Sequence, residues 1–266
     1  MIFDLHNDFP TAFSPREYRK YLDGCGKNTV TAAIWTSDFD KDTARGTVDA
    51  ITNSLRSCGK NRAVHIAIED LGFLTDAERF EFDFSPYIYC SLTWNYNNRF
   101  AGGALDDGDL TRLGKDVIEL MNGKCAIDLA HLNKKSFYSA LEYAARPICS
   151  HTGFADHPRC LDARQIRALI SAGGIIGLCT VSAFSSAASA EEFAAAIDAF
   201  VQKYGADNLA LGTDFNGSKD IPDDLCDYAA IQALAPRLVA LGYDEPTLQK
   251  IFYSNAFNFF TENKHG

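Results

Sequence analysis

The sequence lacks the features that would place it among nucleic-acid-binding or membrane proteins. It has no run of basic residues, and 25 Lys and Arg against 35 Asp and Glu give a formal net charge of −10. Nucleic acids and anionic membrane surfaces are bound through clustered Lys and Arg, so neither is an expected partner. The most apolar stretch, from Gly173 to Phe184, is too short to span a bilayer.

Paired cysteines and an N-terminal leader are also missing. The eight cysteines include no CxxC pair, and Cys90, Cys125, Cys149 and Cys179 fall inside apolar runs. A thiol in such a run behaves as a small buried hydrophobic group. Met1 leads directly into Ile-Phe-Asp-Leu-His, with no signal peptide before it. We therefore expect reduced cysteines and a cytoplasmic protein.

No low-complexity linker, proline-rich hinge or internal repeat divides the 266 residues. Short apolar runs alternate with longer segments of helical period, and most of the runs are apolar throughout, which is typical of parallel strands buried on both faces. A (β/α)8 barrel needs about 250 residues. We therefore predict an α/β fold, a single (β/α)8 TIM-barrel domain over residues 1–266, rather than an open doubly wound sheet.

The predicted strands are Ile2–His6, Thr29–Trp35, Ala63–Glu69, Tyr87–Leu92, Cys125–Leu129, Pro147–Ser150, Gly174–Cys179 and Asn208–Gly212. The predicted helices lie near 42–58, 110–122, 134–145, 162–172, 190–204, 224–241 and 245–262. Asp162 is expected to begin one helix, with Gly173 and Gly174 ending it. Ser189 and Glu192 have capping-box spacing before another.

Metal-type residues gather where the predicted strands end, which is where a barrel carries its chemistry. The first strand ends with Asp-Leu-His-Asn-Asp at 4–8, and a period of two places Asp4, His6 and Asp8 on one face. A His-x-Asp pair offers one nitrogen and one oxygen to the same cation, a donor set suited to zinc.

Four further strands end in residues of the same kind. Glu69 closes the third strand, His131 and His151 end the fifth and sixth, and Asp214 follows the eighth. Taken singly, each has an ordinary alternative, such as a helix cap for Glu69 or Asp214. Three histidines and three carboxylates at one end of five strands together predict a site for two divalent cations bridged by an acid.

The order of these motifs resembles the membrane (renal) dipeptidase family of zinc metallopeptidases, in its bacterial form. The resemblance begins at residue 2 and runs to about residue 217, and the stretch 4–8 is its most specific part. The other motifs are Ile-Glu (68–69), Leu-Thr-Trp-Asn (92–95), Asp-x-x-His (128–131), Ser-His (150–151), His-Pro-Arg (157–159) and Gly-Thr-Asp-Phe-Asn-Gly (212–217).

The resemblance implies an amidohydrolase-like metal-dependent hydrolase with two Zn2+ ions, although the same ligands accept other divalent ions. One ion would be bound by His6 and Asp8, the other by His131 and His151, and Glu69 would bridge them. A water shared by the ions, with its pKa lowered toward about 7, would attack the peptide bond of a dipeptide as hydroxide.

Three more residues acquire roles from the resemblance. Asp214 would shuttle the proton to the leaving amine. Arg159 would hold the terminal carboxylate of the dipeptide, with Trp94 and Asn95 beside the substrate. Without the resemblance, Arg159 is predicted to be a surface arginine after a turn. The resemblance also implies a homodimer.

The sequence departs from the family pattern at several positions. Trp94 stands where many members have a histidine, and an indole N–H can donate a hydrogen bond but cannot titrate. Asp70 replaces a small residue after the bridging Glu69, and Ala130 replaces a serine before His131. The chain is also short for the family, which predicts trimmed loops and a more open pocket.

Two alternatives stay open beside the dipeptidase. One is another barrel metallohydrolase acting on a small amide, such as a deacetylase. Such enzymes commonly begin with His-x-His and bridge their metals with a carbamylated lysine, whereas this chain has His-x-Asp and no lysine at a predicted strand end. The other is a barrel that has lost catalysis and only binds a ligand, although every metal-type position and Asp214 are present.

Overall fold

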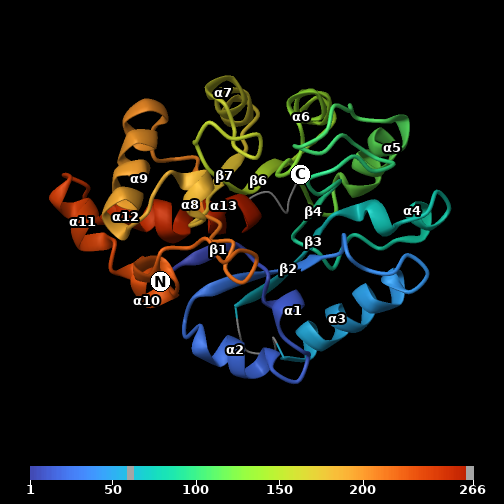
Figure 1. The fold of residues 1–266 in the computed structure, drawn as a ribbon, viewed down its shortest axis with the longest axis horizontal. Helices are drawn as coiled ribbons and strands as arrows, with labels where there is room; N and C mark the ends of the chain where they lie inside the picture. The colour runs from blue at the N-terminus through green and yellow to red at the C-terminus, as the bar shows by residue number, and fades with distance from the viewer. Residues whose placement is uncertain (59–62, 262–266) are drawn as a thin grey trace.

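The computed structural model describes residues 1–58 and 63–261, which build a closed barrel of eight parallel strands (Figure 1). Leu211 of the last strand pairs with Asp4 of the first and closes the barrel. All eight predicted strands and the predicted (β/α)8 fold are confirmed. The strands are β1 Phe3–Asn7, β2 Thr29–Trp35, β3 Val64–Glu69, β4 Tyr89–Ser91, β5 Ala126–Asp128, β6 Pro147–Thr152, β7 Ile175–Leu178 and β8 Leu209–Leu211.

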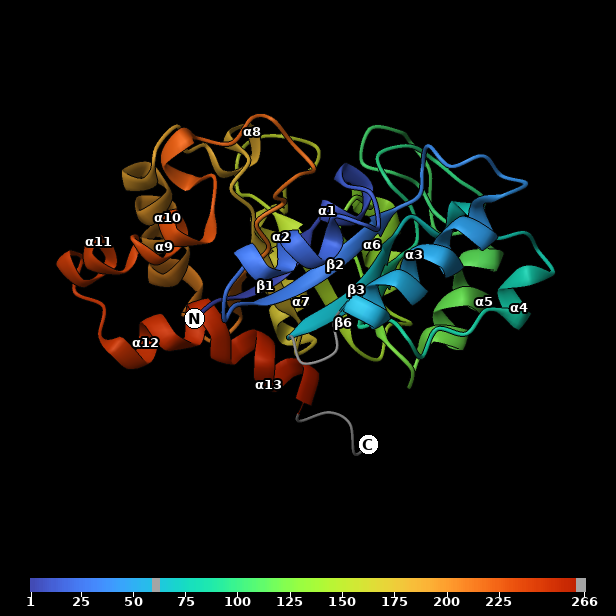
Figure 2. The ribbon, with the colours of Figure 1, turned by 90° about the horizontal axis from the view of Figure 1, so that it is seen from below.

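Two buried layers hold the barrel together. The outward-facing residues of the strands, such as Val30 and Ile34 of β2, join the layer between barrel and helices. The inward-facing residues form a second layer inside the barrel, which α13 (Asn255–Thr261) closes at the N-terminal end of the strands (Figure 2). That inner layer consists of Phe3, Leu5, Ala67, Tyr89, Ala126, Ile148, Ile175, Ala210, Ala256 and Phe260.

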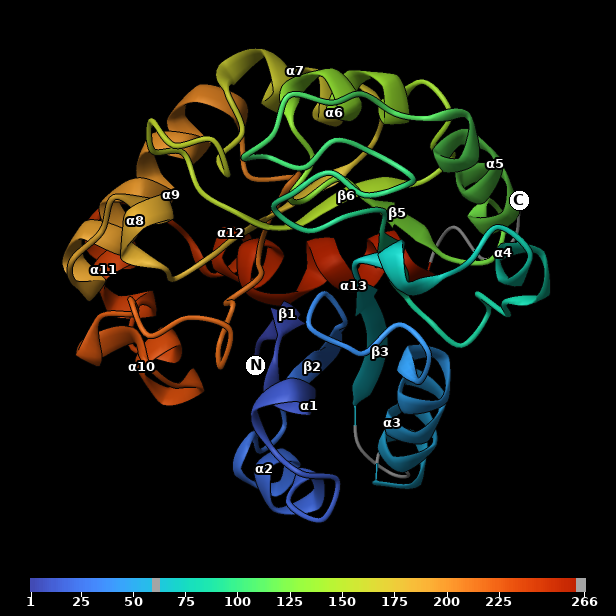
Figure 3. The same ribbon diagram turned by 45° about the vertical axis from the view of Figure 1, so that its right-hand side comes forward.

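Five of the predicted helices are confirmed, and they surround the strands in Figure 3. They are α3 Ala44–Cys58, α5 Arg112–Met121, α6 Lys134–Leu141, α7 Ala163–Ser171 and α9 Ala190–Tyr204. Several short helices were not predicted, because one or two turns carry too little periodicity to be recognised. These are α1 Phe9–Ala12, α2 Tyr18–Gly24, η1 Leu71–Phe73, α4 Glu78–Glu81 and α8 Ser182–Ser185.

The predicted helix 224–241 is wrong as a single element. The structure has η2 (Asp223–Leu225), α10 (Tyr228–Gln232) and α11 (Ala235–Ala240). Asp227 begins α10 by accepting a hydrogen bond from the backbone N–H of Ala230, and Pro236 at the start of α11 has no N–H to continue a helix through it.

The predicted helix 245–262 begins as α12 (Glu245–Gln249), passes through a π-helical turn (η3, Lys250–Ser254) and continues as α13. Its predicted end, residue 262, lies outside the described residues.

The predicted caps are largely confirmed. Asp162 forms a complete capping box with Gln165 at the start of α7, and Gly173 beyond its end has a φ of +72°. Ser189 accepts a hydrogen bond from the N–H of Glu192, as predicted. The Glu192 carboxylate accepts from Ala188 instead of Ser189, so this second box is incomplete.

Bulges interrupt β1 and β6 near their carboxyl ends. In β1 the step from Asp4 to Asn7 lies opposite the shorter step from Val30 to Ala32. In β6 the step from Cys149 to Thr152 is matched in the same way to β7. An extra residue breaks the alternation of side chains. Two consecutive residues, the second of them a histidine, can therefore face the interior at each bulge.

Because of the β1 bulge, the prediction that Asp4 shares a face with His6 and Asp8 is wrong. Asp4 accepts hydrogen bonds from the hydroxyl of Tyr228 at 2.6 Å and from the N–H and hydroxyl of Thr213 at 2.8 and 2.7 Å. It therefore joins β1 to the segment after β8 and to α10.

Candidate metal centre

The barrel brings the six predicted metal-site residues together at the carboxyl ends of the strands. Each is at most 9% exposed. Their ligand atoms form three overlapping sets, and within each set these atoms lie within 4.8 Å of one another. Glu69 is common to two of the sets. The sets are His6, Asp8 and Glu69; Glu69, His131 and His151; and His6, His151 and Asp214.

The two oxygens of Glu69 face different histidines. Oε1 lies 2.6 Å from Nε2 of His131 and 3.7 Å from Nε2 of His151. Oε2 lies 3.5 Å from Nε2 of His6, which is itself 3.3 Å from Oδ2 of Asp8. The carboxylate thus stands between two groups of donors.

The donor atoms fit a divalent cation. Nε2 of His6 and Oδ1 of Asp8 are buried and have no hydrogen-bond partner among the described residues. Leaving a buried polar atom without a partner costs about 1–3 kcal/mol. Imidazole nitrogens mixed with carboxylate oxygens are ligands that zinc and related divalent ions accept.

The protonation states of His131, His151 and Glu69 also suit a cation, whereas at His6 burial is outweighed by Tyr89, Asp8 and Glu69, which raise the pKa of that ring. Burial and the neighbouring Arg159 lower the pKa of His131 to about 3, so its ring is neutral at neutral pH. Burial, together with His6 and His131, lowers the pKa of His151. Burial alone would raise the pKa of Glu69, but His131 and His6 more than offset it and hold that pKa well below its usual value.

Asp214 shares a ligand set with His6 and His151 and has a strained backbone conformation. Its φ is +63°, and its N–H donates to the carbonyl of His6 at 3.1 Å. Burial and the charge of Asp8 raise the pKa of Asp214 well above its usual value. Asp214 can therefore hold a proton at a pH where an ordinary aspartate has lost it.

Arg159 is buried, so the prediction of a surface arginine is wrong. It is 5% exposed, and its Nη2 lies 3.0 Å from Nε2 of both His131 and His151. Its guanidinium carbon is also 5.5 Å from the ring centre of Phe184. The residue belongs to the cluster rather than to the surface.

Asn95 and Trp94 line a cavity whose walls also include Glu69, His131 and Asp214. Oδ1 of Asn95 lies 2.9 Å from Nδ1 of His131, so Asn95 orients that ring. Trp94 lies with its ring centre 5.9 Å from that of His131 and 5.2 Å from that of Trp35. The cavity has a volume of about 520 Å3, and its walls include Thr11, Ala12, Phe184, Asn216 and Ser218 besides residues already named.

Asp70, the departure beside Glu69, has a local structural role. Its carboxylate accepts hydrogen bonds from the N–H of Gly72 at 2.7 Å, from Ser37 at 2.7 Å and from Asn98 at 2.8 Å. These partners follow β3, β2 and β4, so Asp70 ties three neighbouring loops together.

Four residues near the cluster were not singled out from the sequence. Trp35 ends β2 opposite Glu69, and Tyr89 faces the barrel interior from β4. Ser150 and Asp128 lie below His151 and are hydrogen-bonded to each other. Trp35 could have been found as the last residue of a predicted strand. Asp128 and Ser150 stand in the Asp-x-x-His and Ser-His motifs, but their contacts, like those of Tyr89, depend on distances across the barrel that the sequence does not give.

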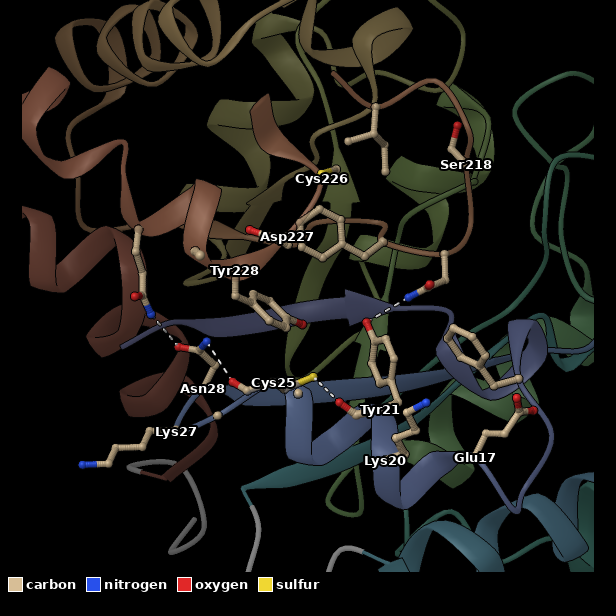
Figure 4. A pocket seen from close by; sticks show the side chains of 18 of the residues that line it. Glu17, Lys20, Tyr21, Cys25, Lys27, Asn28, Ser218, Cys226, Asp227 and Tyr228 are labelled. Carbon is tan, nitrogen blue, oxygen red and sulfur yellow. Dashed lines mark hydrogen bonds between the residues drawn. The ribbon is translucent and has the colours of Figure 1, made fainter. Parts of the chain in front are cut away.

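A second cavity lies behind the loop that carries Asp214. Figure 4 shows it between α2 and the segment leading to α10, with Tyr21 and Tyr228 among its walls. Its volume is about 1090 Å3. Asn216 and Ser218 line both cavities, so the loop after β8 forms part of the wall of each. The Tyr21 hydroxyl accepts a hydrogen bond from Asn216 at 2.9 Å across this wall.

A closed (β/α)8 barrel with histidine and carboxylate donors gathered at its mouth defines a metal-dependent barrel hydrolase. The chain matches the family model for membrane dipeptidase (peptidase family M19) over residues 87–265. It therefore belongs to the membrane dipeptidase family and is a metallo-dipeptidase by class. Among residues 1–58 and 63–261, no helix is both long and apolar enough to cross a membrane.

Two curated proteins resemble part of the chain. An uncharacterized protein in the pqqA 5′ region of Klebsiella pneumoniae is 33% identical over 182 residues, which are 61% of this chain and 67% of that protein. An uncharacterized protein in the PQQ-III 3′ region of Acinetobacter calcoaceticus is 32% identical over 99 residues, 32% of this chain and 31% of that protein.

Solved structures share the whole fold. The dipeptidase AC, a metallopeptidase of family M19, superposes with a TM-score of 0.83 at 20% identity and 97% coverage of both chains. A metallopeptidase of Rhodobacter sphaeroides, liganded with a phosphinate mimic of L-Ala-D-Ala, gives 0.81 at 19% identity, covering 97% of this chain and 98% of that chain. Because the superpositions cover 97% of this chain and 97–98% of those chains, no large segment is trimmed relative to these two structures, and trimmed loops relative to the family as a whole stay a prediction.

Proposed function

We propose that the protein is a dipeptidase that uses two Zn2+ ions, with other divalent ions able to occupy the same ligands. His6 and Asp8 would hold one ion and His131 and His151 the other, with Glu69 shared between them. The observation that supports this proposal best is the place of Glu69, whose two oxygens face separate histidine groups in two ligand sets. Bound ions would supply Lewis acidity and a water molecule of lowered pKa, poised for hydrolysis.

Asp214 is the general acid–base of this proposal. Its carboxyl group belongs to the cluster, and its raised pKa allows it to hold a proton at a pH where an ordinary aspartate is ionised. It would take the proton of the attacking water and deliver it to the leaving amine. Gly217 lies against the carboxyl groups of Asp214 and Asp8, which restricts the positions that both can take.

Arg159, Trp94 and Asn95 complete the proposed substrate site. Arg159 provides donors for the terminal carboxylate of a dipeptide, and the rings of Trp94 and Trp35 form an aromatic wall of the cavity. Asn95 also orients the ring of His131 through a hydrogen bond and would therefore affect the metal site. A free C-terminus within reach of Arg159 would select short peptides.

The test is hydrolysis of L-Xaa-L-Xaa and L-Xaa-D-Xaa dipeptides by the zinc-loaded protein. L-Ala-D-Ala is a sensible member of the panel, because a mimic of it occupies the Rhodobacter sphaeroides structure. Asp214→Asn removes the proton carrier and is expected to lower kcat by about 10²–10⁴-fold without changing the zinc content. Normal turnover in that variant would contradict the role of Asp214.

The same experiment separates the alternatives. Cleavage of N-acetylated amino acids but not dipeptides would favour a deacetylase-like hydrolase on this barrel. Binding of two zinc ions without turnover of either class would favour a barrel that only binds its ligand.

A further inference from the structure

Each histidine of the cluster has an oxygen atom beside its Nδ1. Nδ1 of His6 lies 2.7 Å from Oη of Tyr89, and Nδ1 of His151 lies 2.9 Å from Oγ of Ser150. Asn95 stands in the same relation to His131. A neutral histidine binds a cation through Nε2 only when its proton is on Nδ1. The neighbouring oxygens can therefore determine which nitrogen of each ring is free to bind a cation.

The hydroxyl of Tyr89 has a single proton, which it donates to a backbone carbonyl and not to His6. Tyr89 donates a hydrogen bond to the carbonyl oxygen of Leu5 at 2.9 Å. Its Oη can then only accept from His6, which requires the proton to be on Nδ1. Leu5 belongs to the bulge of β1. One hydroxyl group thus holds both the backbone of the bulge and the ring that follows it.

Ser150 repeats this arrangement in the bulge of β6. Its hydroxyl donates to Oδ2 of Asp128 at 2.6 Å. Oδ1 of Asp128 accepts the N–H groups of Ala130 at 3.0 Å and Ser150 at 2.9 Å, which leaves Oδ2 for the Ser150 hydroxyl. Because the Ser150 hydroxyl donates its hydrogen bond to Asp128, its Oγ can accept a hydrogen bond from Nδ1–H of His151.

Arg159 lies against the Nε2 atoms of two histidines of the cluster. A guanidinium has only donors, and its Nη2 lies 3.0 Å from Nε2 of both His131 and His151. The two Nε2 atoms also lie 2.9 Å from each other, and that of His131 lies 2.6 Å from Oε1 of Glu69, so acceptor atoms converge here as they would around a cation. The rings of His6 and His151 are in direct contact, with their centres 3.7 Å apart. A tilt of one ring would therefore disturb the other.

We propose that Tyr89 and the Asp128–Ser150 pair are positioning residues that fix His6 and His151 with Nδ1 protonated and their Nε2 atoms directed at the two cations. The inference rests on the proposed function and names what orients its ligands. None of the three residues lines the substrate cavity, so their effect on the reaction passes through the histidines.

The test compares zinc affinity, measured by competition with a chelator, in matched variants. Tyr89→Phe keeps the ring inside the barrel and removes only the hydroxyl. It is expected to lower the affinity for one of the two zinc ions about 10–100-fold, the usual effect of removing a hydrogen-bond partner of a metal ligand. Ser150→Ala is expected to weaken the other. Tyr87→Phe is the control, because the Tyr87 hydroxyl faces Thr52 in the outer layer and touches no site residue.

A second readout follows the proton itself. Nitrogen NMR of the zinc-loaded protein should show His6 and His151 with protonated Nδ1, and Tyr89→Phe should shift the His6 signal more than the His151 signal. Unchanged zinc affinities and unchanged Nδ1 signals in folded Tyr89→Phe and Ser150→Ala proteins would overturn this inference. Fewer than two zinc ions on the unaltered protein would instead overturn the proposed function.

Discussion

Gly217 shows how closely the backbone surrounds the two aspartates of the cluster. A Cβ at this position would overlap Oδ2 of Asp8 and Oδ1 of Asp214, far inside van der Waals contact. The Gly217 N–H also donates to the carbonyl of Asp214, whose backbone is already in the left-handed region. The loop therefore leaves no room for a side chain where the proposed ligand and the proposed proton carrier meet.

Gly217→Ala is expected to lower kcat/KM for dipeptide hydrolysis by about 100-fold, because displacement of a catalytic group by about 1 Å has costs of that size. The measurement is steady-state turnover of the best substrate in the panel. Gly46→Ala is the control: Gly46 lies in α3 with nothing near its Cβ position, so turnover should be unchanged there. Equal activity of Gly217→Ala and Gly46→Ala would contradict the account of this loop.

The residues of the site differ in how far their position could be predicted from the sequence. His6, Glu69 and His151 end predicted strands, and their meeting follows from the rule that barrel chemistry lies at strand ends. The burial of Arg159 could not be predicted from local pattern, because His-Pro before it indicates only a turn. Its contacts with His131 and His151 come from the return of the loop after β6 over the barrel mouth.

At the scale of elements, the two bulges decide which side chains reach the cation site. Strict alternation would send Asp4 inward with His6, but the extra residue in β1 turns Asp4 to the outer layer and leaves His6 inside. Bulges carry no reliable sequence signature. The position of the strand could therefore be predicted, but not which of its side chains point into the barrel. In β6 the bulge depends on Gly177 and Gly212, since a Cβ at either position would overlap the carbonyl of Ser150.

The start of α7 provides a prediction that does not involve the site. Asp162 accepts hydrogen bonds from the N–H groups of Arg164 at 2.7 Å and Gln165 at 2.9 Å. Asp162→Ala should lower the free energy of unfolding by about 1 kcal/mol, the usual value for loss of such a cap, and leave turnover unchanged. Denaturant unfolding measures the change. Asp162→Asn, which can still cap, should lose less, and an equal loss in both would contradict the capping role.

Over the whole molecule, the order of eight strand and helix units was readable because most strands are uniformly apolar and most helices are amphipathic. The segments that were misread are 224–241, which a cap and a proline divide, and the short helices α1, α2, η1, α4 and α8, whose one or two turns carry too little periodicity. We propose that residues 1–266 form a single domain, because β8 returns to β1 and α13 closes the same barrel. The cytoplasmic location and the homodimer stay predictions.

Because the proposed ligands come from β1, β3, β6 and the segment after β5, bound ions should stabilise the barrel as a whole. Zinc at 100 times its dissociation constant should add about 2.7 kcal/mol to the free energy of unfolding for each site that binds only the folded protein. That corresponds to a rise in Tm of roughly 5–10 °C for one site. Thermal unfolding with zinc and with a chelator measures it, and identical curves would contradict a metal site built from distant strands.

The central claim is that this barrel hydrolyses dipeptides with two cations bridged by Glu69. Its most direct test is a zinc titration of the chelator-stripped protein, with dipeptide hydrolysis followed at each addition. The account predicts no turnover before zinc is added and a plateau at two zinc ions per chain, with Glu69→Gln failing to reach that plateau. Full turnover by the stripped protein, or no dipeptide cleaved at saturating zinc, would contradict it.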